Sequence, residues 1–199
     1  MTIKRLIVIS SICLYGFSNI GPQGFKAFLN PYFVETGTFS GDGIIRALKD
    51  GFENILSIES VNELYTPVKE KFINNKNVKI THGSSSIDLW DMIKDINEPI
   101  TFWLDAHVFP PRTDGGKNCP LIEELDQIKR HPIKTHTILI DDMHCAAPDG
   151  IAGGEAFDFL TKEDLINKLL EINPNYNIYY VPGGNDGEYP ENVMVAEAK

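Results

Sequence analysis

Apolar and polar residues alternate along this chain with two different periods. Short apolar runs bounded by turn-forming residues predict five strands, at residues 32–35, 54–59, 78–82, 100–105 and 137–141. Between them, apolar residues recur at helical spacing, which predicts helices at residues 44–50, 61–73, 87–96 and 121–130. Strands that alternate with helices are typical of a parallel sheet covered by helices on both faces. The pattern therefore predicts a doubly wound α/β fold.

The end of the chain has a different pattern. Thr161, with Asp164 three residues later, resembles a capping box and predicts a helix over residues 162–172. Two further apolar runs, at residues 176–181 and 193–198, are separated by a glycine-rich segment, which predicts an antiparallel pair of strands. Together with the five parallel strands, this pair gives a Rossmann-like, seven-stranded mixed sheet.

Length and composition fit one globular domain. The chain has 199 residues, of which 42% are hydrophobic, enough for a buried core. We expect residues 31–199 to form this domain, preceded by an N-terminal segment of residues 1–30. The formal net charge is −10 at pH 7, which disfavours a nucleic-acid partner because such binding depends on basic patches. The cysteines are too scattered for a zinc site or a disulfide framework; they are Cys13, Cys119 and Cys145.

The first residues of the chain allow two interpretations. Lys4 and Arg5 precede an apolar run over residues 6–17, as in a signal peptide. The run is short for a membrane-spanning helix, and a buried strand or helix of the domain fits it as well. We expect a cytoplasmic protein, with export or anchoring through residues 4–18 as the alternative, and no other membrane contact beyond residues 1–20.

A glycine-rich run follows the first predicted strand and leads into the first predicted helix. It reads Glu35-Thr36-Gly37-Thr38-Phe39-Ser40-Gly41-Asp42-Gly43. Glycines at a strand–turn–helix junction let the backbone approach a nucleotide-like ligand, and the helix start offers free N–H groups. The acidic Glu35 disfavours a phosphate at this turn and favours a ligand with a positive or hydrogen-bond-donating end.

Polar side chains also follow the next two predicted strands. Glu59 ends the second strand, where a carboxylate accepts hydrogen bonds from ribose hydroxyls; capping the next helix is the alternative role. After the third strand, Ser84 and Ser85 are small enough to line an adenine pocket or to cap a helix, and the two roles are compatible. Since carboxyl ends of parallel strands share one edge of the sheet, these groups converge on a crevice.

Three carboxylates and two imidazoles follow the fourth and fifth strands. The residues are Asp105, His107, Asp141, Asp142 and His144. Three neighbouring carboxylates repel one another unless a cation lies among them, and Mg²⁺ prefers such oxygen ligands. The histidines are candidate softer ligands, and His107 is a candidate general base. The alternative is that an aspartate caps a turn and the histidines have no chemical role.

The motif Glu35-x-Gly37-x-Phe39-x-Gly41 resembles the first motif of class I S-adenosylmethionine-dependent methyltransferases. Among these, it is most similar to the metal-dependent O-methyltransferases of the catechol and macrocin (TylF-like) types, which have an aromatic residue in place of the central glycine. The resemblance implies a set of cofactor-binding residues: Glu35, Gly37, Phe39, Gly41, Glu59, Ser84, Ser85 and Asp105. It also implies that Mg²⁺, or a similar divalent cation, binds at Asp105, Asp141 and Asp142.

One departure from that family concerns the catalytic base. The catechol type has a lysine three residues after its first metal ligand, where this chain has Val108. We therefore take His107, together with Asp105, as the catalytic candidates, with Lys117 and His144 as further candidates for the base. Residues 110–117 are a candidate lid over the acceptor.

The expected activity is S-adenosylmethionine-dependent, metal-assisted O-methylation of a small hydroxylated acceptor, and a homodimer is left open. A non-catalytic, methyltransferase-like binding module is one alternative. An NAD-type oxidoreductase is another, although its usual fingerprint has glycine where this chain has Phe39.

Overall fold

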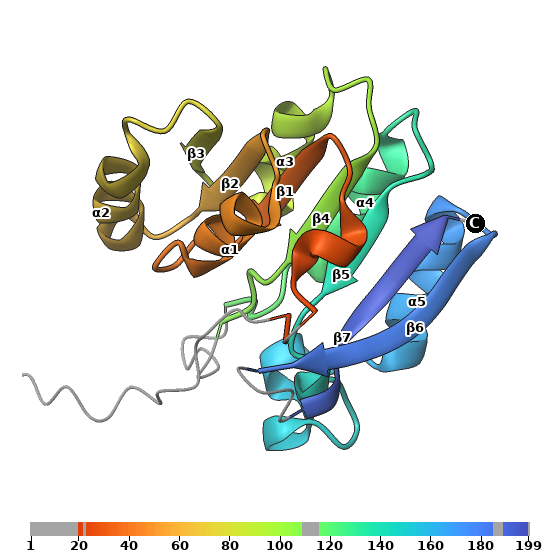
Figure 1. Cartoon of the computed structure of the whole chain (residues 1–199). Helices are drawn as coiled ribbons and strands as arrows, with labels where there is room; N and C mark the ends of the chain where they lie inside the picture. Colours follow the sequence, from red (N-terminus) through yellow and green to blue (C-terminus); the bar gives the residue numbers. More distant parts are fainter. Residues whose placement is uncertain (1–19, 22, 109–115, 185–188, 199) are drawn as a thin grey trace, which may run out of the picture.

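The sheet has the strand order of an open, doubly wound α/β domain with an antiparallel edge. The computed structural model describes residues 20–21, 23–108, 116–184 and 189–198. Seven strands lie in the order β3-β2-β1-β4-β5-β7-β6 (Figure 1). β1 to β5 are parallel, whereas β7 is antiparallel to both β5 and β6. This confirms the predicted fold class.

Each predicted strand forms, with ends that differ by a few residues. The strands are β1 (Tyr32–Thr36), β2 (Ile55–Glu59), β3 (Val78–His82), β4 (Ile100–Leu104), β5 (Thr137–Ile140), β6 (Tyr176–Gly183) and β7 (Tyr189–Ala198). Asp105 and Asp141, which the apolar pattern placed inside strands, each lie one residue beyond a strand end. Their side chains therefore start the loops above the sheet.

The predicted helices also form. They are α1 (Asp42–Asp50), α2 (Asn62–Phe72), α3 (Ser85–Ile93), α4 (Leu121–Arg130) and α5 (Lys162–Ile172), with short 3₁₀ helices η1 (Phe25–Phe28), η2 (Met143–Cys145) and η3 (Ile151–Phe157). The capping box predicted for α5 is present, because Thr161 and Asp164 each accept a hydrogen bond from the other's backbone N–H. The predicted helix over 87–96 instead begins at Ser85 and ends at Ile93.

Two hydrophobic clusters cover the two faces of the sheet. Apolar residues of α3, α4 and α5 form one cluster, and those of η1, α1 and α2 form the other (Figure 1). Successive residues of β4 alternate between them, because Phe102 joins the first cluster and Trp103 the second. Phe25 of η1 is fully buried against Phe33 and Trp103. The packed domain therefore begins upstream of residue 31, the predicted boundary.

Within the described ranges, no helix is both long and apolar enough to cross a membrane. The interpretations of residues 4–18 concern positions outside those ranges, as do most of the residues of the candidate lid over 110–117.

The topology places a crevice at one edge of the sheet. The strand order reverses between β1 and β4, so the chain leaves their carboxyl ends toward opposite sides. Ligands of open α/β sheets bind at such a switch point. The loops that follow β1, β2, β4 and β5 all start at this edge, which is where the candidate residues lie.

Candidate active site

The glycine-rich loop after β1 packs directly on the end of β4. Gly37 has φ +82°, and a Cβ placed there would lie 2.4 Å from the carbonyl oxygen of Asp105. Gly41 has φ +81°, and its missing Cβ would clash with Val68 and Phe72 of α2. Both conformations favour glycine. The loop is therefore held by close backbone contacts, which explains why the motif needs glycine at these two positions.

Phe39 occupies a conformation that non-glycine residues rarely adopt. Its φ is +46°, and its side chain is about half exposed. The ring lies along α2, where it lines a hollow of about 180 Å³ with Leu64 and Val68. The contact between Phe39 and the loop after β2 is therefore made by its backbone N–H, which donates to Glu59, and not by its ring. Strained backbone of this kind concentrates at functional sites.

Glu59 joins two of the loops. Its Oε2 accepts a hydrogen bond from the N–H of Phe39 at 3.0 Å, and its Oε1 accepts one from the N–H of Val61 at 2.8 Å. The second contact satisfies the N-cap residue of α2, as in the capping alternative. Each carboxylate oxygen has a further lone pair, so the predicted ribose contact is compatible with this role and stays a prediction.

Glu35 differs from its predicted role. Its side chain is 1% exposed, and its Oε2 accepts a hydrogen bond of 2.6 Å from the hydroxyl of Ser57 on β2. Burial raises its pKa to about 8. The carboxyl group therefore faces the neighbouring strand and has no surface left for a cofactor. Its sequence position at a strand end does not reveal this, because side-chain direction depends on how β1 pairs with β2.

The two serines begin helix α3. Ser84 is the N-cap residue, and its own N–H donates to Asp88 Oδ2 at 2.9 Å. Ser85 is buried, and its carbonyl accepts a hydrogen bond of 2.8 Å from Gln127 of α4. His82 Nε2 donates to the Ser60 carbonyl at 3.3 Å, which links the loops after β2 and β3. Ser84 thus has the N-cap position, but its hydroxyl pairs with that of Ser86 and makes no capping hydrogen bond to the helix backbone. The adenine contact stays a prediction.

A buried carboxyl group that the sequence analysis did not identify lies beneath these loops. Glu124 of α4 is fully buried, and neither of its side-chain oxygens has a hydrogen-bond partner among the described residues. Burial raises its pKa to about 7, and the nearby hydroxyls of Ser85 and Thr36 oppose this rise. Glu124 occupies an apolar-facing position of a helix, and that conflict with the helical pattern is the signal in the sequence.

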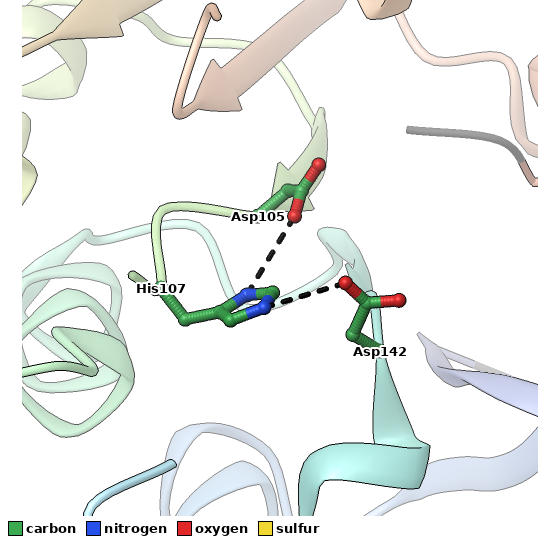
Figure 2. Close-up of side chains that lie close together, drawn as sticks. All are labelled: Asp105, His107 and Asp142. Carbon is green, nitrogen blue, oxygen red and sulfur yellow. Dashed lines mark ion pairs between the residues drawn. The ribbon is translucent and has the colours of Figure 1, made fainter. Parts of the chain in front are cut away.

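Three side chains from the ends of β4 and β5 meet in the crevice. Asp105, His107 and Asp142 each offer one ligand atom, and these atoms all lie within 4.8 Å of one another. Figure 2 shows the imidazole of His107 between the two carboxylates. Its Nε2 lies 3.3 Å from Asp142 Oδ2, and its Nδ1 lies 3.7 Å from Asp105 Oδ1. We refer to these residues as the Asp–His–Asp group.

The environment of His107 keeps its ring in place. The side chain is 8% exposed, and the ring edge packs against Phe157 with the ring centroids 5.2 Å apart. Burial lowers the pKa of His107, although the charge of Asp142 acts in the opposite direction. The predicted general base is therefore a buried ring enclosed by carboxylates.

Asp141, one of the three predicted metal ligands, does not belong to the Asp–His–Asp group. It is 3% exposed, and its Oδ1 accepts hydrogen bonds from the N–H of Asp142 at 2.8 Å and from Asn192 at 3.0 Å. Burial raises its pKa well above the ordinary value, and the charges of Asp142 and Asp105 add to this rise. Among the described residues, the group with metal-ligand spacing contains His107 in its place. The role of Asp141 as a metal ligand stays a prediction, and His107 joins Asp105 and Asp142 as a candidate ligand.

Asn192 of β7 organises the aspartates, and the sequence analysis missed it. Its Nδ2 donates to Oδ1 of Asp141 and also to Oδ1 of Asp142 at 3.1 Å. Its Oδ1 accepts a hydrogen bond from Nδ1 of His144. In the sequence, the one signal for Asn192 is its place directly before the apolar run over residues 193–198. The antiparallel pairing of β7 with β5 brings it to the site.

The other candidate bases are placed differently from each other. Lys117 forms an ion pair with Glu123 at the start of α4. Val108, at the position where the catechol type has its lysine, has a structural contact: its N–H donates to the Asn118 carbonyl at 2.8 Å. Asp158 holds the backbone of Asn118 and Cys119, because its carboxylate accepts hydrogen bonds from both of their N–H groups.

A cavity of about 440 Å³ opens beside His144. Described residues of the segment after β5 and the first turn of α5 line it: Met143, His144, Ala146, Ala147, Pro148, Asp149, Gly150, Thr161, Lys162 and Glu163. This lining has acidic, basic and hydroxyl side chains and no phenylalanine, tyrosine or tryptophan. It suits a small polar molecule better than a flat aromatic one.

Comparisons with solved structures identify the fold. The O-methyltransferase from Bacillus cereus in complex with SAH is similar with a TM-score of 0.56 and 13% identity, over 88% of this chain and 77% of that chain. A Streptococcus mutans protein described as a methyltransferase, also in complex with SAH, has a TM-score of 0.56 and 12% identity, over 87% and 92%. Spermidine synthase in complex with the transition state analogue AdoDATO has a TM-score of 0.56 and 11% identity, over 90% and 57%.

The chain thus has the fold of class I S-adenosylmethionine-dependent methyltransferases. Neither models of protein families nor curated protein sequences match this sequence. Because a spermidine synthase shares the fold, the fold alone does not identify the group transferred.

Proposed function

We propose that this protein transfers the methyl group of S-adenosylmethionine to a hydroxyl oxygen of a small polar acceptor, with help from a divalent cation. One observation carries the proposal. The glycine-rich loop, which Glu59 holds through the N–H of Phe39, lies at the same edge of the sheet as the Asp–His–Asp group. The two are on opposite sides of the switch point between β1 and β4. A nucleotide-like cofactor and an activated hydroxyl would meet there.

The cofactor fits the loops that follow β1, β2 and β3. Gly37 leaves the backbone without a side chain beside β4, and α1 begins at Asp42, where the first N–H groups of a helix have no partner within the helix. Glu59 would accept the ribose hydroxyls through its remaining lone pairs, and the segment at Ser84 and Ser85 would contact the adenine. The bound cofactor supplies an electrophilic methyl group. Glu35 has no part in this contact, because it is buried against Ser57.

The Asp–His–Asp group fits a divalent cation. Two carboxylates and an imidazole are common ligands of such ions, and a bound cation lowers the pKa of a hydroxyl group that coordinates it. Mutual alignment of acceptor and cofactor would supply most of the rate enhancement.

The cavity beside His144 is the proposed acceptor site. His144 lines it, whereas His107 is enclosed by Asp105 and Asp142. Since Nδ1 of His144 donates to Asn192, Nε2 is the nitrogen that would accept the proton. His144 therefore replaces His107 as our candidate base. The polar lining supports an aliphatic hydroxyl compound, such as a sugar, as the acceptor class.

Cofactor binding tests the proposal directly. Calorimetric titration of the purified protein with S-adenosylhomocysteine should give saturable binding in the micromolar range. Glu59→Ala should weaken it at least about tenfold, which corresponds to one lost charge-assisted interaction. Glu63→Ala, the same change at an exposed position in the first turn of α2, is the matched control. Absence of binding in the wild-type protein would contradict the proposal.

Transfer of a labelled methyl group to a panel of sugars and phenols then tests the reaction. EDTA should abolish product formation, and a divalent cation should restore it. In the part of the chain that the structure describes, we see no feature that favours the NAD-type or the non-catalytic alternative.

A further inference from the structure

We propose that the Asp–His–Asp group selects a first-row transition-metal cation, such as Mn²⁺, Fe²⁺ or Co²⁺, over Mg²⁺. The inference deepens the proposed function, on which it rests for the use of the ion, because it names the cation and gives His107 the role of ligand. Binding of the ion itself is independent of methyl transfer, so it is measured without cofactor or acceptor.

The spacing of the group fits a single ion. Ligand atoms bound to one cation at about 2.1 Å lie about 3.0–3.4 Å apart in octahedral or tetrahedral geometry. His107 Nε2 and Asp142 Oδ2 are 3.3 Å apart, and the third residue, Asp105, has a ligand atom within 4.8 Å of the others. Nδ1 of His107 lies 3.7 Å from Asp105 and Nε2 lies 3.3 Å from Asp142, so side chains of the group must rotate for all three residues to bind one cation (Figure 2).

The chemistry of the ligands decides which cation is favoured. Mg²⁺ prefers oxygen ligands and keeps several waters. An imidazole nitrogen is a softer ligand that raises affinity for manganese, iron, cobalt and the later first-row metals relative to magnesium. Asp141, the aspartate that would complete an all-oxygen set, lies outside this group, and its Oδ1 accepts hydrogen bonds from Asn192 and from the N–H of Asp142. His107 therefore occupies the position of the third ligand.

The contrast between two equally spaced histidines supports this assignment. Asp105 and His107 follow β4 with one residue between them, and Asp142 and His144 follow β5 with the same spacing. Of these two histidines, only His107 belongs to the group with metal-ligand spacing. Nδ1 of His144 donates to Asn192 and lies 3.6 Å from Oδ1 of Asp142. The packing of His107 against Phe157 and its 8% exposure show that its ring is held among the carboxylates rather than extended into solvent.

The other histidines of the chain allow a clean experiment. The sequence has 5 histidines, and two of them, His131 and His136, are buried and hydrogen-bonded to each other. His82 is exposed at the end of β3, so His82→Asp controls for metal that binds a surface imidazole. His107→Asp makes the group all-carboxylate and is the test variant.

Competition titrations measure the selectivity, using protein without a histidine tag, freed of metal by chelation. Wild type should bind Mn²⁺ and Co²⁺ at least about tenfold more tightly than Mg²⁺. His107→Asp should reduce that ratio by about tenfold, and His82→Asp should leave it unchanged. Pulsed electron paramagnetic resonance of bound Mn²⁺ should show coupling to a nitrogen nucleus in wild type and in His82→Asp, but not in His107→Asp. Thermal unfolding of each variant verifies that it is folded.

Three results would overturn the inference: equal affinity for Mg²⁺ and Mn²⁺, nitrogen coupling that persists in His107→Asp, or no binding of any divalent cation, which would make the group a structural ion pair. S-adenosylhomocysteine is titrated into the same samples without added cation. Binding of S-adenosylhomocysteine without cation binding overturns this inference and the role of the cation in the proposed function, but leaves the cofactor assignment standing. Cation binding without S-adenosylhomocysteine binding overturns the cofactor assignment and with it the proposed function.

Discussion

The backbone N–H of Phe39 donates a hydrogen bond of 3.0 Å to Oε2 of Glu59. The same carboxylate also accepts from Val61, so it holds the loop after β1 and the loop after β2 in one arrangement. Phe39 adopts φ +46° in this arrangement, a conformation that a non-glycine residue keeps only when its surroundings enforce it. Glu59 is therefore a structural clamp as well as the candidate ribose ligand.

Glu59→Gln should loosen this clamp. An amide has one acceptor oxygen, and its NH₂ group would face a second backbone donor. The expected loss in the free energy of unfolding is about 1–3 kcal/mol, together with weaker binding of S-adenosylhomocysteine. Urea denaturation and calorimetry measure the two effects. Unchanged stability would show that the two hydrogen bonds to Glu59 contribute little.

Gly37→Ala should be far more destabilising than Gly51→Ala. Both glycines have positive φ, +82° and +108°, but only Gly37 faces a backbone atom at 2.4 Å, whereas nothing lies within 4 Å at Gly51. We expect a loss of about 1 kcal/mol at Gly51 from backbone strain alone and about 3 kcal/mol or more at Gly37. Equal losses in thermal or urea unfolding would argue against the close packing of the loop on β4.

Glu124→Gln should stabilise the protein at alkaline pH. Burial raises the pKa of Glu124 from 4.5 to about 7, so the folded state binds this proton more tightly than the unfolded state. The resulting stabilisation is complete below pH 4.5 and is lost as the pH rises through 7. Glutamine does not titrate, so the variant should gain up to about 3 kcal/mol relative to wild type between pH 5 and pH 9. Glu35 titrates in the same direction in both proteins, so the difference between them isolates Glu124. A difference that is constant with pH would contradict the assignment.

His136, which is hydrogen-bonded to His131 in the core, should make stability fall in acid. The N–H of Ile100 donates to His136 Nδ1, His136 Nε2 donates to His131 Nδ1 at 3.0 Å, and His131 Nε2 donates to the Ile96 carbonyl. This chain of bonds requires neutral rings. Burial lowers the pKa of His136 to about 3, and the charges of His131 and Lys134 add to the effect.

For His136 the folded state binds the proton less tightly than the unfolded state. Its contribution to stability is complete above pH 6.5 and is lost as the pH falls toward 3. His136→Asn removes this titration, so the advantage of wild type over the variant should shrink by about 2–4 kcal/mol between pH 7 and pH 4. Urea denaturation at several pH values measures it, and an advantage that grows in acid would contradict the neutral pair.

Asn192→Ala should impair catalysis more than cofactor binding. Asn192 holds Asp141, Asp142 and His144 but lies on the far side of the crevice from the glycine-rich loop. We expect kcat to fall at least about tenfold, while the Kd for S-adenosylhomocysteine stays within about twofold. Loss of the buried hydrogen bonds should also cost about 1–3 kcal/mol of stability. A matching loss of affinity for S-adenosylhomocysteine would show that Asn192 instead supports the whole crevice.

The sheet and its helices were predictable because each element has a local pattern. The helices over Leu121–Arg130 and Lys162–Ile172 were predicted with the ends that the structure shows, since proline and a capping box mark where they start. The strand ends at Asp105 and Asp141 were placed one residue too far, because an aspartate that follows an apolar run reads as its last residue. The functional assignments depend on where each side chain points, and no local sequence pattern reveals that direction.

The sequence by itself determined the fold class, the glycine-rich loop and the edge of the sheet at which acidic residues gather. These follow from periodicity, from the conformational freedom of glycine and from the rule that parallel strands end at one edge. The tertiary structure decided which of those residues meet. It buried Glu35 against Ser57, used Glu59 to join two loops, and put His107 rather than Asp141 beside Asp105 and Asp142. It also brought Asn192 to the site from the last strand, because contacts between residues far apart in the chain depend on strand pairing and packing, which no local pattern contains.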